Sequence, residues 1–352
     1  MKIEVKENNY TIDIDYKSDL KLKNYLNKNR DAKYLVITDK TVFDIYSERI
    51  NYIMKDLNFF IYKFSPGENS KSMENFIKIN KFLSENNFNR GDIIIAFGGG
   101  VVGDISGFVA STYLRGINFI SVPTTLLSMI DSSVGGKNGI NFLNLKNQIG
   151  SFYFPQYVHI DYSFLETLDN KNINNGLAEI FKYSVLKDRE LFDYLKDCGS
   201  LDYEKIIYRS LNIKLDFVRD DEKDKGKRQR LNLGHTIGHG IESLSNYNLN
   251  HGESIGIGTI YMARASYKMG LSEDDFSKEL ISTFKKYGLP TQYEFNTDEI
   301  LKILKHDKKI NKNLINIILP IKIGEVTNKK ISFDELREII ELGKENESSY
   351  WK

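Results

Sequence analysis

Histidines are concentrated in one short part of the C-terminal half of the sequence. His235, His239 and His251 are three of the five histidines in the chain and fall within seventeen residues. A spacing of four places His235 and His239 on one face of a helix. Two histidines from adjoining helices and a distant carboxylate would form a metal site with open coordination positions. The cluster predicts such a site, with capping or packing histidines as the alternative; spacing alone favours His235 and His239 as the ligand pair.

A second group of chemical residues lies in a glycine-rich stretch of the N-terminal half. Asp131-Ser-Ser-Val-Gly-Gly-Lys137 is followed by Lys146-Asn147. A single lysine is most often a solvated surface charge. Clustered beside glycines, which let the backbone turn tightly, these lysines instead predict a site for a phosphate or a carboxylate.

A glycine turn follows a strongly apolar run. Gly98, Gly100 and Gly103 form G-x-G-x-x-G before a helix expected at residues 104–114. Such a turn brings backbone N–H groups close to a pyrophosphate at a helix N-terminus, although it also occurs with no ligand. The usual acid about 20 residues downstream is missing. We therefore expect a dinucleotide to bind, but not in the standard Rossmann manner.

The elements that must position these residues change in type near residue 170. Before it, strand-like runs at residues 34–38, 59–64, 92–97 and 118–122 alternate with helical segments such as 72–86. This alternation predicts an α/β domain over residues 1–170, a mostly parallel sheet with helices on both faces. Residues 171–352 predict an all-helical domain in which only residues 313–320 resemble a strand. We expect the functional site in the cleft between the two domains. The expected helices are residues 175–195, 203–219, 231–245, 252–270 and 272–287.

Bulk composition excludes several classes of partner. The 49 basic and 48 acidic side chains give a formal net charge of +1, so we expect no sequence-independent binding to nucleic acid. Cys198 is the only cysteine, which favours a reducing compartment. No apolar run approaches the roughly 18 residues that span a bilayer. The expectation is a cytoplasmic protein with no membrane partner.

Several motifs along nearly the whole chain resemble one family, the dehydroquinate synthases. They are Gly98-Gly-Gly-Val-Val-Gly-Asp-Ile-Ser-Gly-Phe108, Pro123-Thr-Thr-Leu126, Asp131-Ser-Ser-Val-Gly-Gly-Lys137, Gly176-Leu-Ala-Glu179, Asn232-Leu-Gly-His-Thr-Ile-Gly-His239 and His251-Gly-Glu253. The resemblance implies an N-terminal NAD domain, a helical metal- and substrate-binding domain, and a homodimer. Asn138, Phe154 and Thr41 depart from the common family pattern, but none is a proposed catalytic residue.

The resemblance also assigns roles to individual residues. It makes Glu179, His235 and His251 the ligands of one zinc or cobalt ion, and it moves His239 to the substrate side. The implied cofactor contacts are Asp39, Glu68, Lys71, Gly100, Val101, Val102, Gly103, Asp104, Thr124, Thr125, Lys137, Lys146, Phe164 and Thr167. The implied substrate contacts are Arg115, Asp131, Lys137, Lys146, Asn147, Lys182, Lys214, Arg228, Asn232, His239 and Lys308, with Lys308 favoured over Lys309. Among these, Lys137, Lys182, Arg228, Asn232 and His239 are expected to be catalytic, and Arg115 to reach the neighbouring subunit's site.

The implied activity is that of a lyase in aromatic amino acid biosynthesis, through the shikimate pathway. The substrate would be 3-deoxy-D-arabino-heptulosonate 7-phosphate, cyclised to 3-dehydroquinate with release of phosphate. Three alternatives are another sugar-phosphate cyclase, a metal-dependent polyol dehydrogenase and a non-catalytic NAD-binding regulator. Lys214, Arg228, Asn232 and His239 speak against another cyclase. Lys137, Lys146 and Asn147 speak against a dehydrogenase, and the three metal ligands against a regulator.

Overall fold

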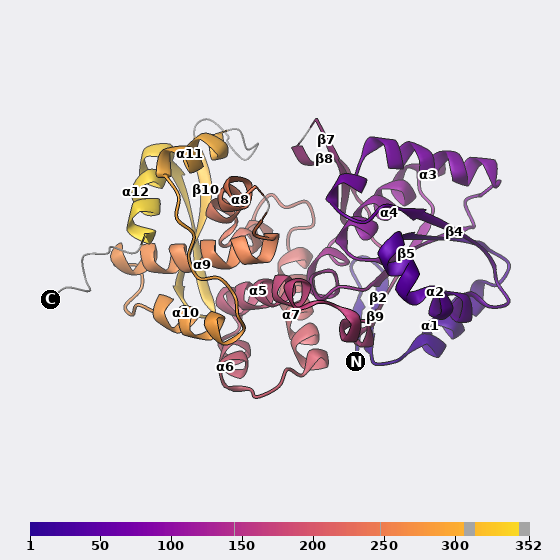
Figure 1. Cartoon of the computed structure of the whole chain (residues 1–352), viewed down its shortest axis with the longest axis horizontal. Coiled ribbons are helices and arrows are strands. Elements are labelled where there is room, and N and C mark those ends of the chain that lie inside the picture. The colour runs from indigo at the N-terminus through magenta and orange to yellow at the C-terminus, as the bar shows by residue number, and fades with distance from the viewer. Residues whose placement is uncertain (144, 247, 306–313, 345–352) are drawn as a thin grey trace. The chain divides into compact units, whose positions relative to one another are not determined.

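The computed structural model describes residues 1–143, 145–246, 248–305 and 314–344. The chain divides into two compact units (Figure 1). Unit 1 contains Met1–Ile173 and Tyr203–Leu211, and unit 2 contains Asn174–Asp202 and Asn212–Lys352. Helix α7 (Tyr203–Arg219) is therefore divided, its first half belonging to unit 1 and its second half to unit 2.

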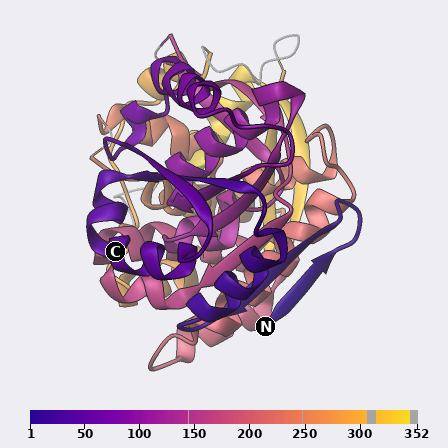
Figure 2. The same ribbon diagram turned by 90° about the vertical axis from the view of Figure 1, so that its right-hand side faces the viewer.

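Unit 1 is built on a seven-stranded sheet with the order β1-β2-β9-β6-β5-β3-β4. Only β1 pairs antiparallel, with β2; the other strands run parallel, and the indigo N-terminal strands form one edge (Figure 2). The strands are β1 (Lys2–Val5), β2 (Tyr10–Asp15), β3 (Lys33–Asp39), β4 (Asn58–Phe64), β5 (Ile93–Gly98), β6 (Asn118–Pro123) and β9 (Tyr157–Asp161).

Both faces of this sheet are buried, as the continuous apolar runs of its central strands require. Leu35 and Ile37 lie in one core cluster with residues of helices α3 and α4. Tyr34 alternates to the opposite face, where its hydroxyl donates to the carbonyl of Leu26 in α1 at 2.8 Å. The helices of this unit are α1 (Asp19–Leu26), α2 (Lys40–Met54), α3 (Met73–Glu85) and α4 (Gly100–Thr112). A separate hairpin, β7 (Lys137–Phe142) and β8 (Leu145–Phe152), packs against α4.

Unit 2 is mainly helical. Its elements besides α7 are α5 (Asn170–Lys187), α6 (Arg189–Asp197), α8 (His235–Leu244), α9 (His251–Lys268), α10 (Ser277–Lys286), α11 (Thr297–Lys305), β10 (Leu314–Lys322), β11 (Glu325–Ser332) and α12 (Phe333–Gly343). Helix α5 begins at Asn170, four residues before unit 2 begins at Asn174. Among the described helices, none has the length and apolar character to cross a bilayer.

The predicted fold class is confirmed, with local differences. Unit 2 is not all-helical, because the apolar stretch after residue 313 pairs with β11 and buries Ile317 and Leu319. The helix expected over residues 175–195 is interrupted at Asp188, whose side chain accepts from the N–H of Leu191 and starts α6. The helix expected from residue 231 begins instead at His235, because Gly234 before it has a left-handed φ of 76°.

Candidate functional site

Three side chains of unit 2 form a candidate metal centre. Glu179 lies in α5, and His235 and His251 are the first residues of α8 and α9. One potential ligand atom from each lies within 4.8 Å of the others. Glu179 is only 1% exposed, so its carboxylate is held inside the unit. Two imidazoles and one carboxylate suit zinc or cobalt and leave positions open for a substrate.

The chain brings α9 against α5 by a close backbone contact. Asn250 and Glu253 form a capping box that starts α9 and places His251 in its first turn. The N–H of Gly252 donates to Oδ1 of Asn175 at 2.6 Å, one turn before Glu179. A Cβ at position 252 would collide with the carbonyl oxygen of Asn175. The glycine therefore allows the approach that joins the two ligand-bearing helices.

Both ligand histidines have their Nδ1 atoms engaged. Nδ1 of His235 lies 3.0 Å from the carbonyl oxygen of Leu233. Nδ1 of His251 lies 3.4 Å from Oε2 of Glu242, while its Nε2 faces Oε1 of Glu179 at 3.6 Å. An Nδ1–H donated to an oxygen leaves Nε2 as the free ligand atom, the usual arrangement of metal-binding histidines. These contacts show that the residues fit a metal ion.

The surrounding charges act on His251. Burial lowers its pKa, but hydrogen bonds to the Glu179 and Glu242 carboxylates outweigh burial and raise the pKa to about 9. Lys182, only 3% exposed, forms an ion pair with Glu179 from one turn along α5. A metal ion requires the neutral imidazole, so binding would release the proton from His251.

His239 belongs to the same histidine cluster but has a different place. Its ring centroid lies 5.2 Å from that of His235 and 5.8 Å from that of His251. Among the described residues, the potential metal ligands that lie close together are Glu179, His235 and His251, and His239 is not one of them. The geometry thus favours the ligands implied by the resemblance over the pair suggested by helical spacing.

The remaining residues predicted to bind substrate in unit 2 are mostly buried cations. Lys182, Lys214 and Arg228 are each at most 5% exposed, and an Nη1 donor of Arg228 also bonds the carbonyl of Glu222 at 2.7 Å. Buried cations require anionic or hydrogen-bonding partners. Asn232 ends the short 3₁₀ helix η6 (Lys227–Asn232) that also carries Arg228. Lys308 and Lys309 lie outside the described residues.

In unit 1, the predicted cofactor residues follow the carboxyl ends of parallel strands. The chain passes from β3 outward to β4 and then back to β5, so the strand order reverses between β3 and β5. Ile37 pairs with Ala96, which places Asp39 and Gly98 side by side at that switch point. Ligands of open α/β sheets bind at such points. The acid missing downstream of the glycine turn thus has a counterpart upstream, in Asp39 on the neighbouring strand.

The first five residues of α4 are the predicted contacts Gly100 to Asp104. Asp104 forms an ion pair with Lys71, which is only 4% exposed. Glu68 begins the short helix η2 (Glu68–Ser70) and accepts from Nδ2 of Asn141 in the β7–β8 hairpin at 2.8 Å. The loop after β4, the glycine turn and the hairpin are therefore joined by charged and polar contacts.

The other predicted cofactor contacts follow β6 and β9. The N–H of Thr124 donates to the carbonyl of Gly98 at 3.0 Å, which brings the end of β6 to the glycine turn. Phe164 and Thr167 lie in the 3₁₀ segment η5 (Tyr162–Thr167) after β9. Phe164 is 1% exposed and packs edge-on against Tyr46, and its carbonyl accepts from the Tyr46 hydroxyl at 3.1 Å.

The substrate residues of unit 1 lie on the hairpin and two nearby turns. Lys137 begins β7, and Lys146 and Asn147 lie in β8, with Asn147 at a φ of 53°. Asp131 lies in a single π turn, η4 (Ser128–Ser132). Arg115 ends the turn η3 (Tyr113–Arg115) with an exposed side chain and a φ of 70°.

Asn138 and Phe154, two of the positions that depart from the family pattern, pack against glycines. Asn138 lies against Gly107 of α4, and its amide donates to the carbonyls of Gly136 and Tyr153, both at 2.8 Å. The Phe154 ring covers Gly136, where a Cβ would lie 2.9 Å from the ring. Both residues support the hairpin that carries Lys137 and need no direct contact with a ligand.

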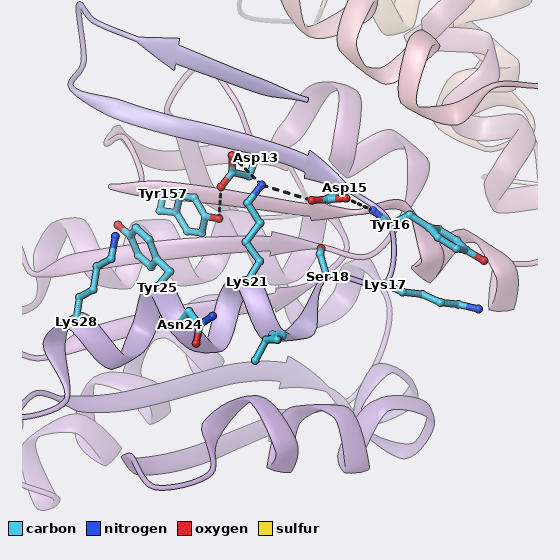
Figure 3. Close-up of a pocket in the computed structure, with 11 residues that line it drawn as sticks. Asp13, Asp15, Tyr16, Lys17, Ser18, Lys21, Asn24, Tyr25, Lys28 and Tyr157 are labelled. Carbon is cyan, nitrogen blue, oxygen red and sulfur yellow. Dashed lines mark hydrogen bonds and ion pairs between the residues drawn. The ribbon is translucent and has the colours of Figure 1, made fainter.

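A cavity of about 550 Å³ in unit 1 lies between β2 and α1, and none of the predicted site residues lines it (Figure 3). Lys21 reaches across it to Asp13 at 3.3 Å and Asp15 at 3.5 Å. The Tyr157 hydroxyl also donates to Asp13, and Tyr25 stacks on the Tyr157 ring. Asp13, Lys21 and Tyr157 thus contact one another.

A parallel sheet with a glycine turn at its switch point, joined to a helical unit with an open two-histidine, one-glutamate site, defines a class of NAD-dependent, metal-dependent enzymes. Residues 61–175 match the family model of the 3-dehydroquinate synthase N-terminal domain, and residues 176–310 match that of its C-terminal domain. The chain belongs to the 3-dehydroquinate synthase family, which confirms the resemblance seen in its motifs.

Individual relatives agree with this assignment. A 3-dehydroquinate synthase of Caldanaerobacter subterraneus is 39% identical over 350 residues, covering 96% of this chain and 98% of the relative. A 2-epi-5-epi-valiolone synthase of Streptomyces hygroscopicus, solved with NAD⁺ and Zn²⁺, is 26% identical with a TM-score of 0.86 and covers 97% of this chain and 98% of its own. A 2-deoxy-scyllo-inosose synthase complexed with carbaglucose-6-phosphate, NAD⁺ and Co²⁺ shares the fold at 23% identity, with a TM-score of 0.85 and the same coverage.

Sequence reasoning from residue types missed Glu242. It lies seven residues after His235, two helical turns along the same face of α8, which is a signal that the sequence does contain. A glutamate at that spacing is also common on ordinary helices. Only the fold shows that His251 lies against it.

Proposed function

We propose that this chain is a 3-dehydroquinate synthase, a lyase that converts 3-deoxy-D-arabino-heptulosonate 7-phosphate into 3-dehydroquinate and phosphate. The observation that carries the proposal is the convergence of Glu179, His235 and His251, with both Nδ1 atoms held, in a member of this family. The turnover would comprise oxidation of a secondary alcohol, phosphate elimination, reduction, ring opening and intramolecular aldol closure.

Two groups that the chain would hold supply the redox and Lewis-acid chemistry. NAD, placed at the switch point by Asp39 and the first turn of α4, would accept a hydride from the substrate and return it. A zinc or cobalt ion held by Glu179, His235 and His251 would lower the pKa of the alcohol that is oxidised. The valiolone synthase with NAD⁺ and Zn²⁺ and the inosose synthase with NAD⁺ and Co²⁺ support both assignments.

The chain's own side chains would bind and orient the substrate. Lysine and arginine groups suit its phosphate and its carboxylate, because charge-assisted hydrogen bonds to such anions are strong and directional. Arg228 and Asn232 come from one short segment, so a single turn presents a guanidinium and an amide together. His239 lies beside the metal ligands, where an imidazole can hydrogen-bond a substrate hydroxyl or move a proton. Holding these groups in place would supply much of the rate enhancement.

Phosphate release tests the proposal and separates its rivals. The purified protein with NAD⁺ and Zn²⁺ or Co²⁺ should release phosphate from the heptulosonate phosphate with no net accumulation of NADH. Another cyclase would prefer a different sugar phosphate, such as glucose 6-phosphate, whose carbocyclic analogue the inosose synthase binds. A polyol dehydrogenase would accumulate NADH with glycerol. No phosphate release from the heptulosonate phosphate by metal-loaded protein would refute the proposal.

The assembly and pathway follow from the same proposal. Because the family resemblance assigns Arg115 to a neighbouring subunit's site, we propose a homodimer with shared sites. Its role would be the synthesis of a carbocyclic precursor in the shikimate pathway.

A further inference from the structure

The buried carboxylate of Glu242 lies next to His251, one of the candidate metal ligands. Glu242 of α8 is 6% exposed, and no role for it follows from the proposed reaction. Its Oε2 lies 3.4 Å from Nδ1 of His251. A glutamate this deeply buried needs a compensating partner, since an isolated carboxylate is costly away from water. The imidazole of His251 is such a partner.

The two nitrogens of the His251 ring face two different carboxylates. Nδ1 faces Glu242, and Nε2 faces Oε1 of Glu179 at 3.6 Å. Nδ1 and Nε2 lie on opposite sides of the ring, so Glu242 is on the side away from the Glu179 carboxylate. Glu242 therefore lies behind the ring and outside the ligand set of Glu179, His235 and His251.

The other histidine of the candidate metal centre, His235, also has an oxygen beside its Nδ1 atom, but this oxygen belongs to the backbone. Nδ1 of His235 is held by the carbonyl of Leu233, a backbone group fixed by the turn before α8. His251 begins α9 directly after its N-cap, and a side-chain carboxylate from α8 fills the position that a carbonyl fills for His235. Each imidazole thus has one oxygen behind it.

We infer that Glu242 is a positioning residue of the metal centre, which accepts Nδ1–H of His251 and so directs Nε2 to the metal. The inference rests on the proposed function for the identity of the site. An oxygen behind the ring fixes the tautomer and the ring orientation and makes Nε2 a better donor; losing such a partner typically weakens metal binding about 10- to 100-fold. Glu242 contacts neither substrate nor cofactor in this role.

The test measures the affinity of purified, metal-free protein for Zn²⁺ by competition with a chromophoric chelator. Glu242→Ala removes the acceptor and should weaken Zn²⁺ binding about 10- to 100-fold. Glu242→Gln keeps the shape and one acceptor oxygen without the charge, so its affinity should fall between those of wild type and Glu242→Ala. If Glu242→Ala does not fold, the Glu242→Gln protein alone decides.

Glu253→Gln is the matched control. Glu253 lies two residues from His251 and accepts from the N–H of Asn250 in the capping box, which glutamine can also do. Its Zn²⁺ affinity should equal that of wild type. The ¹⁵N shifts of labelled histidine in metal-free protein give a second readout: within the neutral imidazole of His251, the Nδ1–H tautomer should dominate in wild type and lose population in Glu242→Ala.

Three results would overturn the inference. The first is wild-type Zn²⁺ affinity in both folded Glu242 variants. The second is an equal loss in Glu253→Gln, which would indicate a general effect on α9. The third is a change in the coordination number of bound Co²⁺ in Glu242→Gln, read from the intensity of its visible absorption bands, which would make Glu242 a direct ligand. Because these measurements use the metal alone, they are independent of phosphate release by the wild-type protein, which tests the proposed function.

Discussion

At the residue scale, the central feature is how the fold distinguishes neighbouring histidines. His235, His239 and His251 are one cluster by ring distance, yet only two of them join Glu179 in the ligand set. His235 and His251 each begin a helix, and their Nδ1 atoms face the Leu233 carbonyl and Glu242, respectively. The same principle applies to His159, a buried histidine far from this cluster in the sequence.

The ligand assignment predicts different consequences for neighbouring histidines. His251→Ala, His235→Ala and Glu179→Ala should each abolish stoichiometric binding of zinc or cobalt, because two ligands cannot hold the ion tightly. His239→Ala should keep its metal and lose activity. Elemental analysis of dialysed proteins measures the first effect, and phosphate release the second. Full metal occupancy in His251→Ala would contradict the assignment.

His159 should make unfolding pH-dependent. Its pKa is lowered to about 4 because it is buried, and it lies between the Ser18 hydroxyl at 3.1 Å and the Tyr157 hydroxyl at 3.3 Å. The unfolded chain, with an ordinary pKa near 6.5, binds the proton first as pH falls. Stability is therefore fully present above about pH 6.5 and is lost progressively towards pH 4, by roughly 3 kcal/mol.

Urea unfolding at a series of pH values measures this loss. His159→Gln cannot take up the proton, so its free energy of unfolding should change less between pH 6.5 and 4 than that of wild type, even if it is lower at pH 7. Parallel curves for the two proteins would show that another group carries the dependence. Asp161, whose pKa is lowered by hydrogen bonds and Arg49 against the effect of burial, contributes mainly below this window.

At the scale of elements, the metal centre depends on how closely α9 approaches α5. Each ligand lies on a different helix, so small helix displacements change the distances between ligand atoms. The Asn175–Gly252 contact sets this approach within unit 2. In unit 1, the contact of Asn138 with Gly107 sets the approach of the β7–β8 hairpin to α4 in a comparable way.

Gly252→Ala should damage the metal centre through backbone displacement. Its methyl group would collide with the Asn175 carbonyl, so α9 must move away from α5 and take His251 with it. We expect a loss of about 1–3 kcal/mol in the free energy of unfolding, as for other overpacked sites, together with weaker Zn²⁺ binding. Gly199→Ala is the control, because a Cβ there meets nothing within 4 Å. Wild-type Zn²⁺ affinity in Gly252→Ala would refute the proposed role of this contact.

At the scale of the whole molecule, the two units divide the chemistry. Unit 1 contains the switch point, the glycine turn and the hairpin lysines, and unit 2 contains the candidate metal ligands and the buried cations Lys182, Lys214 and Arg228. The proposed homodimer would add Arg115 of a second subunit. This assembly can be tested without a structure of the dimer, because two defective subunits can complement each other.

Mixed dimers should recover activity. Arg115→Ala and Lys137→Ala proteins should each be inactive, because each lacks a phosphate contact in every site. In a mixed dimer, one site combines the intact Lys137 of one subunit with the intact Arg115 of the other. Random reassortment should therefore restore roughly a quarter of the wild-type phosphate release. Proven mixed dimers with no activity would exclude shared sites.

The sequence by itself determined the class of the fold and the family to which the chain belongs. Continuous apolar runs specified a parallel sheet buried on both faces, because local hydrophobic patterns report which faces are covered. Gly98 ends β5 as expected, but α4 begins at Gly100 instead of residue 104, so Gly100 and Gly103 lie inside this helix. The motifs identified the family. The sequence determined the ends of helices less well. The Asp188 side chain caps the start of α6, and the left-handed Gly234 precedes the start of α8, and hydrophobic periodicity predicts neither boundary.

Only the tertiary structure decided which residues meet. Helical spacing places His235 and His239 on one face of α8. It does not predict which residues of other helices approach that face. The structure brings Glu179 and His251 to His235, places Glu242 behind His251, and sets Asp39 beside the glycine turn. These are contacts between segments far apart in the chain, or between different helices, and no local pattern encodes them. Packing of whole elements fixes them, through close approaches such as that of Gly252 to Asn175.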